Sequence, residues 1–328
     1  MKKHKSSNLN KSNTKMKRRM IIGICIFVLG VIFIISGIFI YGYFLYSKIN
    51  KVDINKEEVL VNGEDTKEEH KSIINIALFG TDTVDGTRGL SDCNMILSLN
   101  SDKGSIKLCS IMRDTYVEIP GHGENIINMA MMDGGPELAL KTINYNFNLA
   151  IDKFIAVNLE SLPKIVDKIG GLNINVKDDE LQYINSYIRD LNKKNGTNEE
   201  LIVSTGNQLL NGTQVTAYCR IRYTEGTDFK RTERQRFVLK VLFYKMKDLG
   251  INKLSSFLQE SGDLITTNIS YYELLSLGTE IVGFDTSNFS QNRFPSDGDH
   301  WSTGTFADYK LHMDKEITTN KIHQFIYD

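Results

Sequence analysis

Residues 206–239 read GNQLLNGTQVTAYCRIRYTEGTDFKRTERQRFVL, and this stretch organises what is expected of the rest of the chain. Its TAYCRIRY run has the pattern of a β-strand. Because side chains alternate between the two faces of a strand, Arg220 and Arg222 would point the same way. The stretch therefore predicts a strand that presents two arginines, followed by a short turn and a helix.

The helix that follows carries a second polar set at helical spacing. Asp228, Arg231 and Gln235 fall within about 60° of one another on a helix of 3.6 residues per turn. Arginines that converge on one place repel one another unless an anion lies between them, and the planar guanidinium suits the oxygens of a phosphate or diphosphate. The alternative is an ordinary solvated surface, since arginine-rich helix faces usually face water. The ordered spacing favours the anion site.

The overall composition is that of an ordinary globular protein. The chain has 328 residues, of which 41% are hydrophobic and 24% are charged, with a formal net charge of −1. Nothing in this balance indicates nucleic-acid binding. Residues 73–328 contain no long linker and are expected to form a single domain with a sizeable core.

The N-terminal region differs sharply from these averages. Residues 1–19 contain eight Lys or Arg and no acidic residue, and residues 20–47 contain no charged residue. As a helix, the second segment would extend about 42 Å, enough to cross a hydrocarbon core of about 30 Å. A cleaved signal peptide is the alternative, but the run is long and no A-x-A-like site follows it. The prediction is a transmembrane helix at 20–47, with residues 1–19 as a basic cytoplasmic tail.

The remainder is then expected outside the cell, with residues 48–72 as a polar linker. Short apolar runs and longer amphipathic segments alternate along residues 73–328, which predicts an α/β domain with a mixed central sheet between helix layers. Strands are expected at 73–79, 93–100, 105–112, 151–159, 172–176 and 309–313, and helices at 136–149, 161–169, 251–260, 270–283 and 316–328. The polar residues 177–205 are interpreted as a variable excursion.

Two acidic residues lie near strand ends and are candidate metal ligands. Asp82 follows the first predicted strand, and Asp92 precedes the second. Two close carboxylates repel unless they share a cation, and Mg²⁺ binds one or two carboxylates together with phosphate oxygens and water. The alternative is that aspartates in such a Gly- and Thr-rich loop simply form turns. Arg113 and Asp114, which follow the strand at 105–112, are expected near the same ligand.

The cysteines outside the predicted span do not indicate a disulfide framework. If residues 93–100 and 105–112 form a hairpin around the SDKG turn, pairing Asn100 with Ser105 sets Cys109 opposite Ile96. Cys93 is then not the direct neighbour of Cys109. There is no C-x-x-C motif, so metal binding by these thiols is not expected.

Several segments together resemble the LytR-CpsA-Psr family of cell-envelope proteins. In the family's order across residues 75–240, they are NIALFGTDT, LSDCNMILSLN, SIMRDTYVEIPG, NMAMMDGG, VDKIGGLNINV, GNQLLNGTQVTAYCRIRY and DFKRTERQ. The resemblance implies a mixed sheet between helices with an apolar tunnel for a prenyl chain. It also implies a membrane-anchored phosphotransferase that moves a glycopolymer, such as teichoic acid or capsule, from a polyprenyl diphosphate carrier to peptidoglycan.

The resemblance also assigns roles to individual residues. Asp82 and Asp92 match the aspartates that bind Mg²⁺, with Mn²⁺ as an alternative ion. The residues that match the family's diphosphate-binding arginines and the remaining polar members of its helix motif are Arg113, Arg220, Arg222, Arg231, Asp228 and Gln235. The general base is unassigned, and Asp114 and Asp228 are the candidates.

The chain departs from the family pattern at a few positions. Leu90 stands where the family has an arginine beside the metal loop, and Ile126 and Met129 replace a lysine and a histidine. These changes leave open a non-catalytic module that binds polyprenyl phosphates as an envelope scaffold or in signalling. A hydrolase that releases the polymer is a further variant. Transcriptional regulation does not suit the predicted topology, because a basic tail of this length is too short for a DNA-reading domain.

Overall fold

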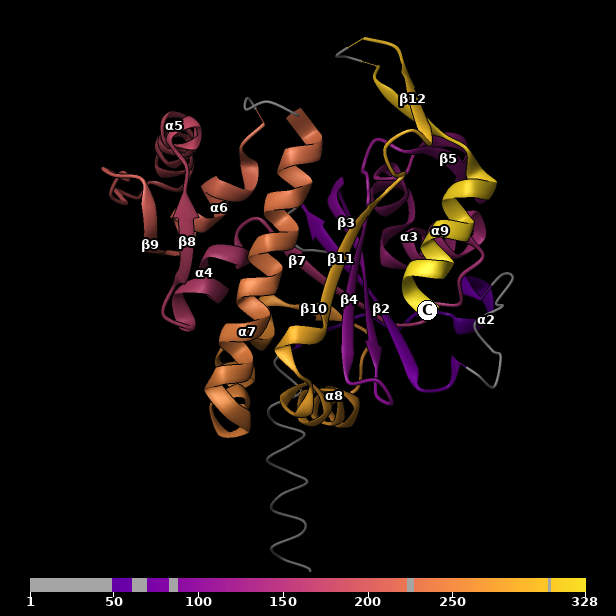
Figure 1. The fold of residues 1–328 in the computed structure, drawn as a ribbon, viewed down its shortest axis with the longest axis horizontal. Helices are drawn as coiled ribbons and strands as arrows, with labels where there is room; N and C mark the ends of the chain where they lie inside the picture. The colour runs from indigo at the N-terminus through magenta and orange to yellow at the C-terminus, as the bar shows by residue number, and fades with distance from the viewer. Residues whose placement is uncertain (1–48, 61–69, 83–87, 223–226, 306–307) are drawn as a thin grey trace, which may run out of the picture. The chain divides into compact units, whose positions relative to one another are not determined.

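The computed structural model describes residues 49–60, 70–82, 88–222, 227–305 and 308–328 (Figure 1). The predicted basic tail and transmembrane helix, at residues 1–47, lie outside this range. In the part that is described, no helix combines the length and apolar character needed to cross a bilayer.

A seven-stranded mixed sheet forms the centre of the described domain. In spatial order its strands are β1 (Asn50–Lys51), β10 (Thr266–Thr267), β7 (Phe154–Asn158), β2 (Ile73–Thr81), β3 (Ser91–Asn100), β4 (Ser105–Ile111) and β11 (Phe289–Phe294). The β2–β3, β3–β4 and β10–β7 pairs are antiparallel, while β2–β7, β4–β11 and β1–β10 are parallel. Asn100 pairs with Ser105 and Ile96 with Cys109, which confirms the predicted hairpin register.

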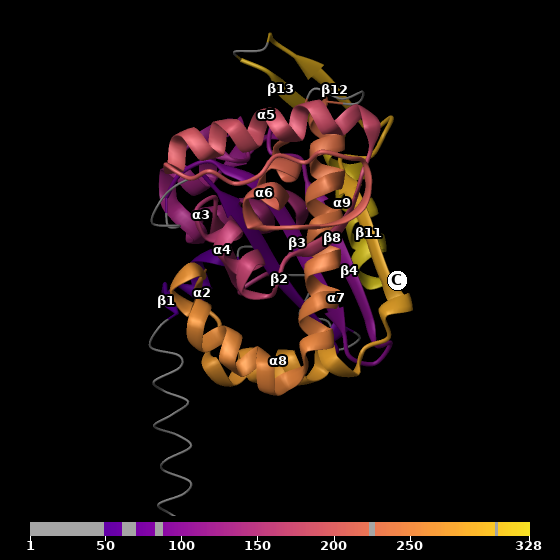
Figure 2. The same ribbon diagram turned by 90° about the vertical axis from the view of Figure 1, so that its left-hand side faces the viewer.

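Helices cover both faces of this sheet (Figures 1 and 2). Successive strand side chains point to opposite faces, so neighbouring residues of β2 enter different cores. Ala77 packs in the core that includes Phe147 of α3 (Met129–Phe147) and Ile322 of α9 (Lys315–Tyr327). Ile76 packs with Leu277 of α8 (Tyr271–Gly283) in a second core, which also receives side chains from α7 (Thr227–Ser261). The predicted layered α/β architecture is confirmed.

A third core lies in a lobe beside the sheet. Its elements are α4 (Ser161–Lys168), β8 (Leu172–Val176), α5 (Asp178–Asn195), β9 (Gly206–Leu210), α6 (Gly212–Arg220) and part of α7. Residues 177–205, interpreted from the sequence as a variable excursion, are mostly helical, because α5 occupies the larger part of them. Ile184, Ile188 and Leu191 are buried one turn apart on α5, which is the apolar stripe of an amphipathic helix.

The predicted strand at TAYCRIRY is also wrong, because residues 216–220 of this run form the end of α6. The helix is fixed at its start by a reciprocal capping box. The Asn211 side chain accepts a hydrogen bond from the Gln214 backbone N–H at 2.9 Å, and the Gln214 side chain accepts one from the Asn211 N–H at 3.0 Å. Arg220 is therefore the last helical residue and Arg222 lies beyond the helix, so the two do not share a strand face.

Most of the other predicted elements are present. The helix expected from Pro136 forms the second part of α3, where Gly135 (φ 68°, ψ −160°) breaks the helical geometry and Pro136 restarts it. The helices expected at 161–169 and 270–283 are α4 and α8, and the segment at 251–260 lies in α7.

Smaller elements complete the described chain. The expected strand at 309–313 is β13 (Lys310–Met313), which pairs with β12 (His300–Thr303). The remaining elements are α2 (Lys56–Val59), β5 (Tyr116–Ile119), β6 (Gly123–Ile126) and two single-turn 3₁₀ helices (Gly262–Leu264 and Thr286–Asn288).

Candidate active site

Three arginines and three aspartates meet where β3 begins, β4 has ended and α7 begins. We call this group, defined by its residues, the charged cluster: Asp92, Arg113, Asp114, Arg222, Asp228 and Arg231. Distant parts of the sequence supply its members, so the fold is what brings them together.

Arg113 is the centre of the charged cluster. Its Nη1 donates to Asp92 Oδ1 at 2.5 Å, and its Nε lies 3.3 Å from Asp114 Oδ1 and 3.8 Å from Asp228 Oδ1. Burial is the largest influence on the pKa of Arg113 and acts to lower it, but the three carboxylates together raise it above its ordinary value. Arg113 is therefore held charged inside a largely buried site.

Arg222 and Arg231 flank this centre. Arg222 Nη2 lies 3.7 Å from Asp92 Oδ2, and its Nε lies 3.9 Å from Asp228 Oδ1. Arg231, whose side chain is only 3% exposed, places Nη2 2.9 Å from Asp228 Oδ1 one turn away on α7. The sequence suggested that an anion must separate converging arginines. In the structure the protein's own carboxylates do so.

A β-bulge sets the position of Asp92. Gly80 pairs with Cys93 and Thr81 pairs with Ser91, so Asp92 is the extra residue on β3. Bulges of this kind redirect a side chain and terminate regular pairing. Burial is the largest influence on the Asp92 carboxyl and acts to raise its pKa, but Arg113, Arg231 and Arg222 together lower the pKa below its ordinary value. Asp92 is therefore ionised at neutral pH.

Asp82 lies at the same end of the β2–β3 pair and is exposed. Its backbone N–H donates to the Leu90 carbonyl at 3.2 Å, and its Oδ1 accepts from the Leu90 N–H at 2.9 Å. Asp82 thus closes the loop between the strands, whose residues 83–87 are outside the described range. Asp82 therefore has the turn-forming role that the sequence offered as an alternative. Its Oδ2 has no hydrogen bond among the described residues.

The carboxylate oxygens of Asp82 and Asp92 are hard donors of the kind that Mg²⁺ prefers. Three guanidiniums and three carboxylates give the charged cluster a formal charge near zero, so it would not by itself neutralise a diphosphate. Among the described residues, no three His, Cys, Asp or Glu side chains are placed to hold a metal ion. A cation at Asp82 and Asp92 would therefore take the rest of its shell from water or phosphate oxygens, as Mg²⁺ commonly does.

Two of the predicted site residues lie differently from the rest. Arg220 ends α6 with its guanidinium 5.3 Å from the centre of the Tyr187 ring, and it makes no ion pair with the described carboxylates. Gln235 follows Arg231 by one turn of α7, and its buried Oε1 has no hydrogen bond among the described residues. The same holds for the buried Nε atoms of Arg113 and Arg231. Buried polar atoms are normally satisfied, so these three atoms are exceptions within the part of the chain that the structure describes.

Asp114, which the sequence offered only as a possible base, belongs to the charged cluster. Burial is the largest influence on its carboxyl and raises its pKa, and the nearby Asp228 adds to this despite the opposing effect of Arg113. A carboxylate of raised pKa beside a bound phosphate is suited to accept a proton.

A buried ion pair behind the charged cluster has no counterpart among the sequence predictions. Arg234 Nε donates to Glu180 Oε1 at 2.7 Å, and Arg234 Nη1 donates to the Ile221 carbonyl at 3.2 Å. Both side chains are at most 7% exposed. Glu180 Oε2 also accepts from the Lys177 N–H, which caps α5. The pair therefore joins α5 and α7 and holds the backbone next to Arg222.

The three cysteines that the structure describes are unsuited to this chemistry. Cys93, Cys109 and Cys219 are free thiols. Burial raises the pKa of Cys93 and of Cys219 to about 12, and it also raises the pKa of Cys109. Thiols with such pKa values are poor nucleophiles at neutral pH.

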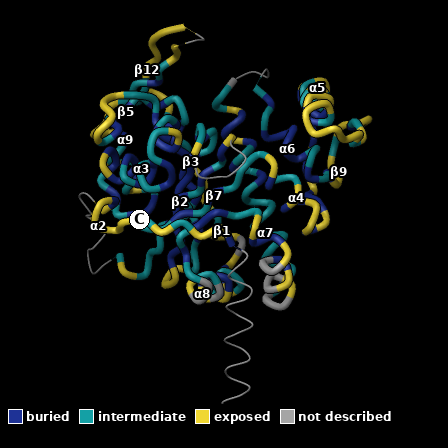
Figure 3. Tube along the Cα trace, turned by 180° about the vertical axis from the view of Figure 1, so that it is seen from behind, coloured by how far each residue is buried: buried dark blue, intermediate teal, exposed yellow. Residues whose placement is uncertain are grey.

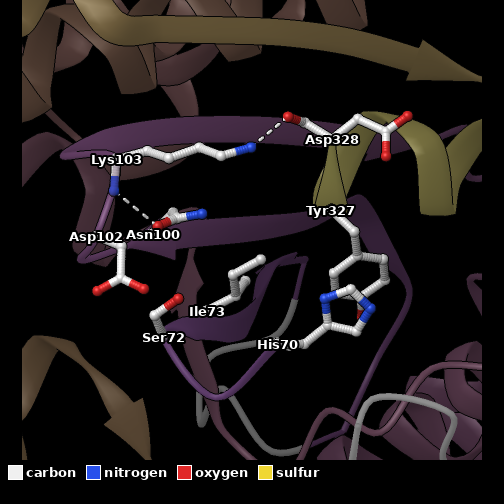
Figure 4. A pocket seen from close by; sticks show the side chains of 8 residues that line it. All are labelled: His70, Ser72, Ile73, Asn100, Asp102, Lys103, Tyr327 and Asp328. Carbon is white, nitrogen blue, oxygen red and sulfur yellow. Dashed lines mark hydrogen bonds between the residues drawn. The ribbon is translucent and has the colours of Figure 1, made fainter. Parts of the chain in front are cut away.

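A surface pocket of about 380 Å³ lies at the other end of β3 (Figure 4). There Lys103 Nζ donates to the Asp328 carbonyl at 2.5 Å, and the rings of His70 and Tyr327 pack with centroids 4.2 Å apart. Asn100 lines this pocket and lies eight positions along β3 from Asp92, a separation of about 26 Å in an extended strand. These contacts fasten the end of α9 to the sheet and are separate from the charged cluster.

Comparisons with known proteins agree on one family. The sequence profile of the LytR_cpsA_psr family matches residues 39–322. The chain is 29% identical over 322 residues to the polyisoprenyl-teichoic acid–peptidoglycan teichoic acid transferase TagU of Bacillus mycoides strain KBAB4, covering 94% of this chain and 97% of that protein.

Solved structures show the same fold. The crystal structure of TagT from Bacillus subtilis is similar with a TM-score of 0.65 and 21% identity. A structure of the LytR-CPS2A-psr family protein YwtF (TagT) with bound octaprenyl pyrophosphate lipid is similar with a TM-score of 0.63 and 21% identity. Each comparison covers 84% of this chain and 99% of the other.

Proposed function

The chain belongs to the LytR-CpsA-Psr family, and on that premise we propose that it transfers a glycopolymer from a polyprenyl diphosphate carrier to peptidoglycan. The observation that carries the proposal is the charged cluster, in which three guanidiniums converge and the buried Nε atoms of Arg113 and Arg231 make no hydrogen bond to the described residues. Two relatives support it. One is named for teichoic acid transfer to peptidoglycan, and the other binds a prenyl pyrophosphate.

Arg113, Arg222 and Arg231 would bind the diphosphate oxygens of the carrier. Each charge-assisted hydrogen bond contributes about 1.5–3 kcal/mol, and the contribution accelerates transfer only where the bond strengthens as charge develops on the leaving group. Gln235 lies one turn along α7 from Arg231 and would add a neutral contact. Arg220 stays a predicted participant, since its place at the end of α6 is near Arg222 in the chain but outside the charged cluster.

The transfer step needs little covalent chemistry from the protein. An acceptor sugar hydroxyl attacks the phosphorus that carries the glycopolymer, and a new P–O bond forms as the bond to the bridging oxygen breaks. The lipid monophosphate leaves, and the hydroxyl proton passes to a carboxylate. Asp114 is the better of the two candidate bases, because its pKa is raised and it therefore accepts a proton more readily. The carboxylate of Asp228 is bound by Arg231.

Asp82 and Asp92 would hold Mg²⁺, or Mn²⁺ in its place, at the bulged end of β3. Such an ion supplies positive charge to the phosphate oxygens. Asp92 is held ionised by its arginine neighbours, and Asp82 is exposed at the same strand end. Both side chains would supply hard oxygen ligands, and Asp92 would do so while it also accepts a hydrogen bond from Arg113.

We place the domain outside the cell on the basis of the N-terminal sequence. The basic residues 1–19 would stay in the cytoplasm, and residues 20–47 would cross the membrane. Protease added to intact protoplasts is expected to digest the domain and leave a membrane-protected N-terminal fragment. Full protection of the domain would contradict this topology.

The proposal is tested by incubating the full chain in detergent micelles with a polyprenyl diphosphate-linked teichoic acid, peptidoglycan and Mg²⁺, and measuring the lipid monophosphate released. Arg113→Ala and Arg231→Ala are expected to abolish release. Lys230→Ala is the matched control, because Lys230 is exposed on the same helix and pairs with Glu233. EDTA is expected to stop release and added Mg²⁺ to restore it.

Two outcomes would contradict parts of this proposal. If lipid monophosphate is released in EDTA at the same rate as without it, the proposed metal site at Asp82 and Asp92 is excluded. Tight binding of the donor with no release by the wild type would make the chain a lipid-binding envelope protein, which the replacements at Ile126 and Met129 leave open.

A further inference from the structure

The β12–β13 hairpin projects from the domain (Figures 1, 2 and 3). It carries the aromatic side chains of Trp301 and His312. Trp301 is 54% exposed, and its ring stacks on that of His312 with centroids 5.5 Å apart and planes 9° apart. His312 in turn packs against Tyr116 of β5, with centroids 5.2 Å apart. We call Trp301, His312 and Tyr116 the aromatic platform.

The hairpin is joined directly to the charged cluster. The Leu311 N–H of β13 donates to the Asp114 carbonyl at 2.9 Å, and Leu311 forms a parallel bridge with Thr115. On the other strand, the His300 ring lies 5.3 Å from the Phe229 ring, next in sequence to Asp228. The hairpin that carries Trp301 and His312 is therefore attached to the segments that contain the two candidate bases.

The chemistry of the aromatic platform suits a sugar. Leaving an indole half exposed on a surface hairpin is unfavourable, because apolar ring surface stays in contact with water. Large exposed aromatic rings typically mark binding surfaces. The apolar C–H face of a β-linked pyranose packs flat on an aromatic ring. The hydroxyl groups of the sugar then point outward from the edge of the pyranose ring. Here His312 Nε2 and Thr303 Oγ1 form a hydrogen bond of 2.8 Å with each other, which places polar atoms beside the stacked rings.

We propose that the aromatic platform binds the glycan strand of peptidoglycan as the acceptor and so presents a sugar hydroxyl to Asp114 and Asp228. This inference rests on the proposed function and adds to it the place of the acceptor. The donor's diphosphate would occupy the arginines, whereas the attacking hydroxyl must reach a proton acceptor. The acceptor is therefore the substrate that must extend toward the hairpin.

The chain contains a single tryptophan, so its fluorescence reports on the aromatic platform alone. The full chain in detergent micelles is titrated with a soluble β-1,4-linked N-acetylglucosamine oligomer. A saturable change in emission is expected, with no saturable change on adding an α-1,4-linked glucose oligomer, free teichoic acid or lipid vesicles. An absent response to the first probe, or an equal response to teichoic acid or vesicles, would overturn the proposal.

Variants then separate acceptor binding from the rest of the reaction. Trp301→Ala is expected to raise the KM for peptidoglycan about tenfold and to leave the KM for the lipid donor unchanged. Trp301→Phe is expected to restore most of the loss, because it keeps a flat ring. Tyr145→Ala is the control, since Tyr145 is an exposed aromatic residue on α3. An unchanged acceptor KM in Trp301→Ala would overturn the proposal.

The two proposals fail separately. If the wild type releases no lipid monophosphate, the proposed transfer function fails, and the fluorescence titration still decides whether the aromatic platform binds the glycan. If transfer proceeds and Trp301→Ala matches the wild type in both assays, the proposal for the acceptor fails and the transfer function stands.

Discussion

Arg113 contacts all three carboxylates of the charged cluster, yet each aspartate has a different environment. Asp92 is held ionised by three arginines, Asp228 is bound by Arg231 on its own helix, and Asp114 has a raised pKa. Similar side chains at one site can therefore take different roles, because burial and charged neighbours set their proton affinities separately.

Replacing each candidate base with asparagine distinguishes these roles. Asp114→Asn is expected to lower kcat about 100- to 10,000-fold with little change in donor KM, because a proton acceptor is lost but the arginines stay in place. Asp228→Asn is expected to raise donor KM as well, because Arg231 loses its ion-pair partner. Steady-state kinetics with varied donor checks both. A wild-type kcat in Asp114→Asn would exclude it as the base.

Asp92 makes stability depend on acid pH. Its pKa is lower in the folded chain than in the unfolded chain, so its ion pairs stabilise the fold fully above the ordinary aspartate pKa of about 3.9. That contribution is lost as the pH falls through the lowered folded-state pKa. Urea unfolding is expected to show wild type more stable than Asp92→Asn at pH 7, with the difference shrinking below about pH 4. A difference independent of pH would contradict this origin.

For single residues, the spacing along the sequence predicted contacts within one helix. It did not predict contacts between residues of different elements. Asp228 and Arg231 meet one turn apart, as the D-x-x-R spacing indicated. Arg222 reaches the charged cluster, but from the segment after a helix rather than from a strand. Nothing local in the sequence shows that Glu180 of α5 forms an ion pair with Arg234 of α7.

At the scale of elements, this Glu180–Arg234 pair joins α5 to α7. Glu180→Ala removes the carboxylate that balances the charge of the buried Arg234 guanidinium, and this is expected to lower the free energy of unfolding by about 3–5 kcal/mol. Asp190→Ala is the control, because Asp190 is exposed on the same helix. Urea unfolding monitored by circular dichroism measures both. A loss within about 0.5 kcal/mol for Glu180→Ala would show that the pair contributes little.

Gly212 sets how closely α6 approaches α4. A Cβ at this position would lie 2.0 Å from the Pro163 backbone oxygen, so a side chain requires one helix to move. Gly212→Ala is therefore expected to destabilise the chain by about 1–3 kcal/mol and to displace Arg222, which follows α6. Gly283→Ala is the control, because a Cβ there meets no atom within 4 Å. Equal thermal midpoints for the two variants would contradict this packing constraint.

The elements that sequence patterns predicted well are those with clear turn or cap signals. The SDKG turn gave the β3–β4 register, and Pro136 after two glycines gave the main part of α3. For α6, the aromatic and β-branched residues of TAYCRIRY suggested a strand, although the Asn211–Gln214 capping box was present as a contrary signal. The stripe of Ile184, Ile188 and Leu191 in α5 was equally readable but was obscured by polar neighbours.

At the scale of the whole molecule, α7 connects the site to two of the three cores. Val238 packs in the lobe with α5 and α6, and Phe243 packs on the sheet with α8, while Asp228 and Arg231 at the start of the same helix belong to the charged cluster. A ligand held by the charged cluster therefore contacts a helix that both the sheet and the lobe keep in position. The β12–β13 hairpin adds a further element at the same place through Leu311.

The most direct test of the central claim is the amount of glycopolymer joined to washed peptidoglycan through a new phosphodiester, after incubation of the full chain with a lipid-linked donor and Mg²⁺. The wild type is expected to form this bond, and the Arg113→Ala/Arg231→Ala double variant is expected to form none while remaining folded. Equal formation by the double variant, or no wall-linked polymer from the wild type, would contradict a transferase built on the charged cluster.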